Sequence, residues 1–572
     1  MRGKSKAFLC IIIIAVLATI PAPVVECTEL IEESRYIAQA VLDDSYTKHE
    51  VIAICNNSDF SGQDWPGSGS FDDPYVLEGL NITDNATGIS IKNTTVYFEI
   101  RNCIVSSVNP SSSHGIMFHN VTNGVVQDCR VTRHSRGVYL SNSTSCRLSN
   151  NTAIDNLGVG LYLKDSSSCI LTGNLASNNS VDDIYAIGGI YLENTNDTVL
   201  SNNRASTNDG RGVYLRSSYG CKLTHNTVHA NYFSGFFVVL SDNCNLTNNI
   251  AFNNSVDDFY SYGGFYISNA HHNRLANNTS YNNSGPGFTL ERANNSTLRN
   301  NTARGGYKGF HIITSEDCLV SGNEAFSNGA GFLLWYSSHN EITMNTASNN
   351  SGDGFLLRPS SSCLLTHNVA TGNERGVYLH QNSKNNLLYG NRLGYNTEIN
   401  GLDNGGPNAW DNGTHGNYWS DYAGGDSYSV PGPGNSTDNH PYLLDLIPPR
   451  IDHPSDITYL ARATGNNITW HPSDTNPQSF EVYRNGSLIE SSPWNGSSIL
   501  INIDGLHPGT YNFTIVVYDQ GDNSVHDTVI VTVVPRTIET VILTAGLLMG
   551  VVIAVLVIIE FKEIREKNDP FG

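Results

Sequence analysis

The stretch GVYLSNSTSCRLSNNTAIDN, residues 137–156, is one copy of a phrase that recurs through most of the 572-residue chain. Each copy holds a glycine, an apolar–x–apolar triplet, a small residue and then the pattern x-L-x-x-N-x-A-x-x-N. Nine of the eleven steps between successive copies are 22 or 23 residues long, and two are 29. A fixed period of this length is typical of a solenoid. The copies begin at Gly115, Gly137, Gly160, Gly189, Gly212, Gly235, Gly264, Gly287, Gly309, Gly331, Gly354 and Gly376.

Alternation inside each copy predicts short β-strands. In the triplet after Gly137, Val138 and Leu140 should point inward and Tyr139 outward. A helix is excluded because no copy offers an i, i+3, i+4, i+7 apolar stripe, and glycine and asparagine are poor helix formers. Consecutive copies should pair in parallel at about 4.8 Å per rung. We therefore expect an all-β fold, a right-handed parallel β-helix over residues 111–400, with residues 28–110 as N-terminal cap and first irregular rungs and residues 401–447 as a closing module.

Asparagine occupies two registers of the repeat. Its side-chain amide can bond to the same residue one rung along, and its backbone tolerates tight turns. We interpret both series as structural ladders rather than as ligands. The first series is Asn151, Asn174, Asn203, Asn226, Asn249, Asn278, Asn301, Asn323, Asn345 and Asn368, and the second is Asn156, Asn179, Asn208, Asn231, Asn254, Asn283, Asn328, Asn350 and Asn373.

Six of the 11 cysteines share another register, in which other copies carry Ser, Thr or Asn. That exchange favours small buried thiols. Adjacent-rung Cα atoms about 4.8 Å apart also allow disulfides, and metal binding is the least favoured reading because no C-x-x-C motif occurs. The adjacent-rung pairs are Cys103 with Cys129, Cys146 with Cys169, and Cys221 with Cys244.

The N-terminus resembles an export signal. Arg2, Lys4 and Lys6 precede an apolar run over residues 7–20, so residues 1–27 are predicted to be a secretory signal peptide, with a retained anchor as the alternative. Many Asn-x-Ser/Thr sequons, including those at Asn142, Asn245 and Asn512, suit an exported glycoprotein.

The C-terminus predicts a membrane anchor. Residues 537–559 form a long apolar stretch, which we expect to be a transmembrane helix, and the basic residues of 560–572 predict a cytoplasmic tail. The protein should then be a single-pass protein of the cell membrane with an extracellular N-terminal ectodomain. The formal net charge of −21 argues against a nucleic-acid partner, which would need clustered Lys and Arg.

Residues 448–535 have a different rhythm. Stretches such as SFEVYRNGSLI and YNFTIVVYDQ alternate in polarity and are separated by turns every 8–12 residues. This spacing is typical of a β-sandwich of immunoglobulin or fibronectin III type, with Trp470 as its core tryptophan. We expect it to act as a spacer, with partner binding as the alternative.

The best carboxylate pairs of the chain lie in its two longer repeats. NNSVDDIYAIGG (178–189) contains Asp182 and Asp183, and NNSVDDFYSYGG (253–264) contains Asp257 and Asp258. Polysaccharide cleavage would need two carboxylates within several ångströms of each other, yet the inserts lie three rungs apart, or roughly 14 Å. Duplication of a block of repeats explains their similarity, so these four residues are candidates for catalysis that the spacing does not favour.

The outward middle position of the repeat carries an aromatic side chain in six successive copies. Stacked rings on a flat sheet can bind sugar faces, and neighbouring Lys164, Glu193 and Arg216 would supply polar contacts. Cross-strand aromatic packing that stabilises the sheet is the competing interpretation. The predicted ligand-binding stripe is Tyr139, Tyr162, Tyr191, Tyr214, Phe237 and Tyr266, with Lys164 and Arg216 beside it.

After the repeats, the string GNYWSDY (Gly416–Tyr422) is followed by Pro441–Tyr442. Together with the repeats, it resembles the NosD-like, or pectate-lyase-like, right-handed β-helix proteins common on archaeal cell surfaces, and the sandwich resembles archaeal surface Ig-like modules. The resemblance implies carbohydrate or surface-ligand binding more often than a defined reaction. Related closing modules carry an Asp-rich stretch, for which this chain has only Asp421, Asp426 and Asp438 as candidates for calcium.

One branch of the resembled family implies copper delivery, but no Met- or His-rich cluster supports copper here. We therefore expect no cofactor, with calcium as the alternative. The predicted function is non-catalytic binding of a polysaccharide, a surface glycan or another cell-surface protein. The alternatives are a polysaccharide lyase or glycoside hydrolase, and a structural surface-layer or adhesion protein.

Overall fold

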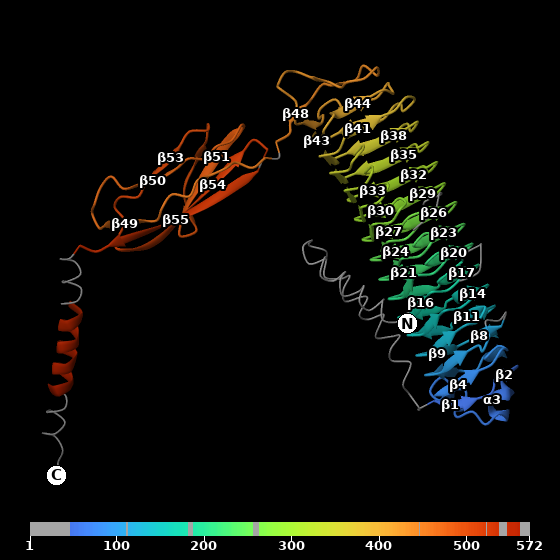
Figure 1. The fold of residues 1–572 in the computed structure, drawn as a ribbon. Helices are drawn as coiled ribbons and strands as arrows, with labels where there is room; N and C mark the ends of the chain where they lie inside the picture. The colour runs from blue at the N-terminus through green and yellow to red at the C-terminus, as the bar shows by residue number, and fades with distance from the viewer. Residues whose placement is uncertain are drawn as a thin grey trace, which may run out of the picture. The chain divides into compact units, whose positions relative to one another are not determined.

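The repeats fold into a right-handed parallel β-helix, as predicted (Figure 1). The structure is a computed structural model that describes residues 46–109, 113–180, 187–255, 262–445, 447–521, 523–536 and 546–560. The chain divides into two compact units, one made of Met1–Leu387, Leu402–Asn408 and Gly432–Gly434, and the other of the remaining residues. The predicted signal peptide lies outside the described residues.

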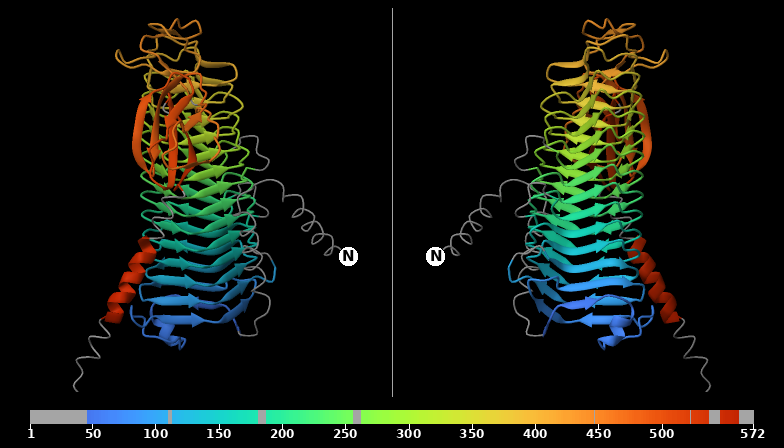
Figure 2. Two further views of the ribbon diagram at one scale, coloured as in Figure 1. Left: turned by 90° about the vertical axis from the view of Figure 1, so that its left-hand side faces the viewer. Right: turned by 90° about the vertical axis from the view of Figure 1, so that its right-hand side faces the viewer.

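Each coil of the first unit contributes one strand to each of three parallel sheets, named A, B and C here (Figure 2). Sheet A contains β1 (Thr47–His49), β4 (Leu80–Thr83), β7 (Ile104–Ser106), β10 (Arg130–Thr132), β13 (Thr152–Ile154), β16 (Leu175–Ser177), β19 (Arg204–Ser206), β22 (Thr227–His229), β25 (Ile250–Phe252), β28 (Thr279–Tyr281), β31 (Thr302–Arg304), β34 (Glu324–Phe326), β37 (Thr346–Ser348) and β40 (Val369–Thr371). Sheet B contains β2 (Ile52–Ile54), β5 (Ile89–Thr94), β8 (His114–Val121), β11 (Arg136–Ser141), β14 (Val159–Lys164), β17 (Ile190–Glu193), β20 (Val213–Arg216), β23 (Phe236–Val239), β26 (Phe265–Ser268), β29 (Phe288–Glu291), β32 (Phe310–Ile313), β35 (Phe332–Trp335), β38 (Phe355–Arg358) and β41 (Arg375–Leu379). Sheet C contains β3 (Tyr75–Glu78), β6 (Phe98–Arg101), β9 (Gly124–Gln127), β12 (Arg147–Ser149), β15 (Ile170–Thr172), β18 (Val199–Ser201), β21 (Lys222–Thr224), β24 (Asn245–Thr247), β27 (Arg274–Ala276), β30 (Thr297–Arg299), β33 (Leu319–Ser321), β36 (Glu341–Thr343) and β39 (Leu364–Thr366).

The coils begin earlier than the repeat pattern. Strand β1 pairs in parallel with β4, and β2 pairs with β5, so the strands from Thr47 onward already belong to the helix. The one short helix here, α3 (Ser58–Gly62), buries Phe60. The Phe60 ring stacks on Tyr75 with centroids 4.9 Å apart and contacts Phe98 at 5.2 Å. These aromatic contacts cover apolar side chains of the first rungs.

The predicted inward and outward alternation is confirmed. Val138 pairs with Leu161 and Tyr139 with Tyr162, so equivalent positions stack from coil to coil. Val138 and Leu140 are fully buried. In later coils the first inward position is phenylalanine, and stacked rings 4.7–4.9 Å apart, tilted by 5–7°, fill the core from Phe265 to Phe355. Continuous burial of this kind supplies the main stabilisation of a solenoid whose coils contact only their neighbours.

The asparagine ladders are also confirmed. The main-chain N–H of Asn203 donates to Oδ1 of Asn226 at 2.9 Å, and its Nδ2 donates to the same oxygen at 3.0 Å. Nδ2 donates in addition to the carbonyl of Leu171 at 2.8 Å. The preceding residue, Asn202, has φ of 55°, a left-handed turn that asparagine tolerates better than most residues. Each ladder residue therefore satisfies buried backbone groups of neighbouring coils at a corner where no sheet can do so.

The cysteines lie where the repeat predicts. All nine described cysteines are free thiols, and eight of them are buried. The thiol of Cys146 donates to the carbonyl of Thr144 at 3.5 Å, and that of Cys169 to Ser167 at 3.4 Å. The six residues that could pair across rungs, Cys103, Cys129, Cys146, Cys169, Cys221 and Cys244, are thiols in this structure.

The second unit holds the closing strands and a two-sheet domain. The closing strands are β42 (Leu387–Tyr389), whose first residue belongs to the first unit, β43 (Arg392–Gly394), β44 (Ile399–Asp403), of which Leu402 and Asp403 belong to the first unit, β45 (Tyr418–Trp419), β46 (Tyr428–Ser429), β47 (Thr437–Asp438) and β48 (Tyr442–Leu443). Here an asparagine ladder ends on a carboxylate: Nδ2 of Asn391 donates to Oδ1 of Asn417 at 2.8 Å, and the N–H of Asn417 donates to Oδ2 of Asp438 at 2.7 Å.

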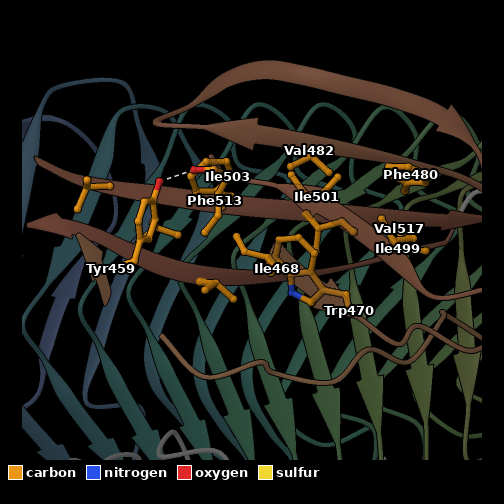
Figure 3. Close-up of a cluster of buried hydrophobic side chains, with 14 of the residues drawn as sticks. Tyr459, Ile468, Trp470, Phe480, Val482, Ile499, Ile501, Ile503, Phe513 and Val517 are labelled. Carbon is orange, nitrogen blue, oxygen red and sulfur yellow. Dashed lines mark hydrogen bonds between the residues drawn. The ribbon is translucent and has the colours of Figure 1, made fainter. Parts of the chain in front are cut away.

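The two-sheet domain has the strand content predicted for residues 448–535. A five-stranded sheet has the order β49-β55-β54-β51-β52, and β50 pairs with β53 in a second sheet. Trp470 is fully buried in the core between Ile468 and Ile499, as Figure 3 shows, and its Nε1 donates to Asp527 at 2.7 Å. The bounds are β49 (Ile457–Leu460), β50 (Asn467–Trp470), β51 (Pro477–Arg484), β52 (Ser487–Pro493), β53 (Ile499–Asn502), β54 (Gly509–Asp519) and β55 (Ser524–Val534).

The prediction of a transmembrane helix over residues 537–559 is wrong, and with it the single-pass placement in the cell membrane. Among the described residues, no helix is both long and apolar enough to cross a bilayer. The described part of this segment is helical over residues 546–560.

Candidate glycan-binding face

The predicted aromatic stripe is a continuous ladder on the outer face of sheet B. Strand register places the six rings one above the next on consecutive coils. Neighbouring ring centroids are 4.7–5.3 Å apart from Tyr139 to Tyr266. The structure therefore brings together all six aromatic residues that the sequence singled out.

Tyr191 and its two neighbours in the ladder stack face to face. Tyr191 is tilted by only 14° from Tyr162 and 18° from Tyr214, with centroids 4.7 Å away on both sides. Tyr191 is 3% exposed and Tyr162 is 6% exposed. A sugar ring therefore cannot stack on these faces, and only the partly exposed rings of Tyr139, Tyr214 and Tyr266 offer their edges. Ring orientation is a consequence of rung spacing that the outward position of each residue does not reveal.

Arginines cover one edge of the ladder. The guanidinium of Arg136 lies 4.7 Å from the ring centroid of Tyr139 and 5.2 Å from that of Tyr162. Arg211 lies 5.0 Å from the Tyr214 centroid and 4.3 Å from that of Phe237. These cation–π contacts hold positive charge on the outer face. Sequence reasoning missed both residues, although each directly precedes the glycine of its copy.

The other edge carries the predicted polar residues. Lys164, Glu193 and Arg216 are register partners on β14, β17 and β20. Lys164 Nζ lies 3.7 Å from Glu193 Oε2, and the hydroxyl of Tyr162 donates to the same carboxylate. Burial, together with the Glu193 carboxylate, raises the pKa of Tyr162, so its hydroxyl stays protonated and remains a donor.

A shallow cavity of about 330 Å³ opens where the ladder begins. Its residues come from successive rungs, because Lys92 pairs with His119, and His119 pairs with Ser141. His119 Nδ1 and Ser141 Oγ lie 2.9 Å apart. The cavity connects the edge that carries Lys164 to Tyr139, the first ring of the ladder. Its lining is Lys92, Met117, His119, Tyr139, Ser141, Asn142, Lys164 and Asp165.

A larger cavity of about 520 Å³ lies on sheet C. It is bordered by Phe71, which is exposed and makes an edge-to-face contact with Tyr97 at 5.5 Å. Glu99 and Arg147 place opposite charges in its lining. We favour the smaller cavity as the candidate site. Its lysines lie beside the aromatic ladder, whereas the larger cavity is lined by one cation, Arg147, away from the ladder.

The candidate catalytic residues Asp182, Asp183, Asp257 and Asp258 lie outside the described residues. The bases of the two inserts that contain them are described and are built alike. Ser180 Oγ accepts from the N–H of Gly188 at 2.8 Å, and Ser255 Oγ accepts from that of Gly263 at 3.0 Å. Beyond the second insert, Tyr262 makes an edge-to-face contact with Tyr266 at 4.8 Å. The described ends of both inserts therefore lie beside the ladder.

The candidate calcium residues are not brought together. Asp438 is buried and accepts from the N–H of Asn417 and, at 2.9 Å, from Trp419 Nε1, so its carboxylate ends the ladder. Asp421 accepts from the hydroxyl of Tyr428 at 3.0 Å, and Asp426 is exposed. Elsewhere in the described ranges, a single group of three potential metal ligands has its ligand atoms within 4.8 Å of one another, namely Asp445, Asp474 and Asp519.

These donors do not fit copper. Carboxylate oxygens are hard ligands that suit Ca²⁺ or Mg²⁺, whereas copper is held by His, Cys and Met. In the carboxylate group, Asn476 Nδ2 already donates to Asp445 at 2.6 Å. Met117 and His119 are both outward residues of β8, but they supply two soft or borderline donors, too few for a copper site. The described part of the chain therefore does not assemble a copper-binding set.

Comparison with known proteins places this geometry in context. A family model described as "Periplasmic copper-binding protein (NosD)" matches residues 70–261, 177–289 and 253–424. No curated protein matches the chain. Among solved structures, a double mutant of the periplasmic alginate epimerase AlgG is 14% identical, with 64% of this chain and 83% of that one covered and a TM-score of 0.35.

Two further solved structures match smaller shares of the chain. An alginate lyase from a Paenibacillus species is 12% identical, with coverage of 46% and 98% and a TM-score of 0.31. Fibronectin(III)-like modules of Clostridium thermocellum CbhA are 13% identical, with coverage of 15% and 98% and a TM-score of 0.13.

Proposed function

We propose, for a chain that belongs to the family of periplasmic copper-binding proteins (NosD), that the β-helix binds a polysaccharide or surface glycan along the outer face of sheet B without cleaving it. The observation that carries this proposal is a reversal of charge. The whole chain has a formal net charge of −21, yet the ladder is bordered mainly by cations. Among the described residues those cations are Lys92, Arg136, Lys164, Arg211 and Arg216, against Glu193, Glu291 and Asp165.

Local positive charge on an acidic protein favours an anionic ligand. The remaining negative charge of the surface repels acidic polymers, so binding would be confined to this face. Carboxylate or sulfate groups on a glycan would pair with the lysine and arginine side chains. An acidic polysaccharide is therefore the ligand class that the electrostatics support best.

The shape of the face favours a polymer over a small molecule. The cavity beside Tyr139 is shallow, and the ladder beyond it is a strip rather than an enclosed pocket. A linear chain laid along such a strip gains a weak contact at each rung, and linked weak contacts add to a useful affinity. The contacts would be made mainly by the cations and by the edges of the partly exposed Tyr139, Tyr214 and Tyr266, because the other rings are buried.

Binding of the purified full-length chain to panels of acidic and neutral polysaccharides tests the proposal. We expect acidic polymers to bind with strong salt dependence, and the double variant Lys92→Ala/Lys164→Ala to lose about tenfold or more in affinity. Lys222→Ala, which removes an exposed lysine from sheet C, is the matched control. Equal binding of neutral polymers, or equal loss in the control, would argue against the assignment.

Parallel assays distinguish the competing functions. One assay measures whether the unchanged chain releases reducing ends or unsaturated sugars from a polysaccharide. Such release, if it is lost when Asp182 and Asp183 are changed, would establish cleavage and overturn the non-catalytic part of the proposal. Binding of another cell-surface protein without any glycan binding would instead favour an adhesive or structural role.

A further inference from the structure

Beyond Tyr266 the outer face of sheet B changes character. The middle column of the ladder continues with Thr289, His311 and Leu333, which are register partners on β29, β32 and β35. The flanking column continues with Trp335, which pairs with Arg358. The continuous aromatic stacking therefore ends, and a mixture of polar, charged and apolar side chains follows on the same surface.

Two polar atoms in this segment are buried without a partner. Nε2 of His311 and Oγ1 of Thr289 make no hydrogen bond within the described part of the chain. His311 is 7% exposed, and Thr289 is less exposed still. Leaving a buried donor or acceptor unsatisfied costs about 1–3 kcal/mol, so native proteins keep such atoms only rarely.

Positive charge in the same segment is balanced only in part, because the Asp353 carboxylate interacts with the Arg358 guanidinium, whereas Lys308 makes no ion pair among the described residues. Burial and the nearby Arg358 guanidinium lower the pKa of Lys308 to about 8. Burial and the charge of Lys308 lower the pKa of His311 to about 3, so its imidazole is neutral at physiological pH.

The acidic side chains of this segment are committed elsewhere. Asp353 Oδ1 lies 2.5 Å from Arg375 Nε. Glu291 accepts from the hydroxyl of Tyr266 and lies 3.3 Å from Arg292 Nη1. Lys308 instead points its ammonium at the ring of Tyr307, 4.8 Å from the centroid.

We propose that Lys308, His311 and Thr289 form a subsite for an oxyanion, the carboxylate or sulfate of an acidic sugar. An oxyanion would offset the positive charge and accept hydrogen bonds from the Thr289 hydroxyl and from a protonated Nε2 tautomer of neutral His311. Trp335 supplies the sugar contact: it is 40% exposed, and its ring lies 6.3 Å from that of His311 at an interplanar angle of 20°. Unlike the ladder rings, it therefore keeps surface free for a pyranose. The sugar part of this inference rests on the proposed function, whereas the anion part does not.

Titration of the full-length chain with sodium glucuronate and with sodium sulfate, at constant ionic strength in chloride, tests the subsite. We expect Lys308→Met to weaken binding of both anions about tenfold or more, and His311→Leu to weaken it several-fold. Lys222→Met on sheet C should bind as the unchanged chain does. Equal affinity of Lys308→Met and the unchanged chain, or no binding of either anion to the unchanged chain, would overturn the proposal. Circular dichroism checks that each variant is folded. If Lys308→Met does not fold, Lys308→Gln takes its place.

Two further comparisons identify the source of the anion and separate this site from the ladder. Trp335→Ala should weaken glucuronate binding while leaving sulfate binding unchanged, and equal loss of both would remove the sugar from the assignment. Lys92→Ala/Lys164→Ala should leave glucuronate binding at Lys308 intact. If that double variant abolishes it, the anion is bound at the start of the ladder and the subsite is refuted.

Discussion

The outer face of sheet B is built in two ways on one repeating backbone. From Tyr139 to Tyr266 the side chains complete one another, through stacked rings, arginines over ring faces and hydroxyl–carboxylate bonds. From Thr289 to Arg358 they do so less completely, because two buried polar atoms are left without a hydrogen-bond partner among the described residues. The inward column is buried beneath both segments, as aliphatic side chains under the first four rings and as phenylalanine from Phe236 onward. With the core held by the inward column, the outward column is free to serve either stability or a ligand.

Removing a ring from the completed segment should have the largest effect. We expect Tyr191→Ala to lower the free energy of unfolding by about 3–5 kcal/mol, because it removes a buried ring that is stacked on both sides. Denaturant titration measures the change. Tyr219→Ala, at a tyrosine that is 54% exposed, should stay within about 0.5 kcal/mol and serves as the control. Equal losses in the two variants would remove the structural half of the comparison.

Acid should act through the buried histidines of the first unit. The pKa values of His114 and His134 are lowered by burial to about 4, and that of His311 to about 3. Because the pKa of each histidine is lower in the folded chain, the unfolded chain binds the proton first as the pH falls. The free energy of unfolding that depends on the neutral histidines is therefore complete above pH 6.5 and is lost as the pH falls from 6.5 towards 3–4. We expect a loss of about 1–3 kcal/mol for each fully buried histidine.

Variants assign that loss to residues. His311→Leu and His134→Asn should each flatten the stability–pH curve between pH 6.5 and 4, measured by denaturant titration at several pH values. His134 already donates its N–H to Asn156 Oδ1 at 3.1 Å, so asparagine there would extend the second ladder. An unchanged slope in both variants would show that carboxylates control the acid response.

At neutral pH the same His311→Leu change should be nearly silent. It removes a buried polar atom that has no partner, so we expect the free energy of unfolding to change by less than about 1 kcal/mol, or to rise. Thr289→Val should behave alike. A loss above about 2 kcal/mol in either variant would show that the atom is satisfied in the folded protein and would weaken the contrast with Tyr191.

The smallest expected effect on stability is at the edge of the ladder. The Lys164–Glu193 pair joins side chains that are 42% and 24% exposed, so Lys164→Ala should cost no more than about 0.5 kcal/mol. Thermal unfolding at low and high salt measures it. The same variant should lower the affinity for acidic polysaccharide, so a large change in stability without a change in binding would reassign Lys164 to the fold.

What the sequence predicted well depends on the period. Val138, Tyr139 and Leu140 were placed correctly because alternation and rung spacing determine their directions, and Asn203 because its register repeats. Arg136 and Arg211 were missed because the position before the glycine varies from copy to copy. Buried cations and unsatisfied atoms such as those at Lys308 and His311 depend on three-dimensional neighbours that no single copy contains.

The ladder that ends at Asp438 gives the solenoid a polarity. From asparagine to asparagine the bonds run towards the C-terminal side, from Asn391 to Asn417 and from Asn417 to Asp438, while the amide also donates to a carbonyl of a preceding coil, as Asn417 does to Leu388. A carboxylate can accept these bonds but cannot pass them on. Asp438 therefore acts as a terminator, much as a chain-ending monomer stops a polymer. The row of aligned amide dipoles ends on a negative charge. It therefore leaves no open row of amides to which another coil, or another molecule, could add.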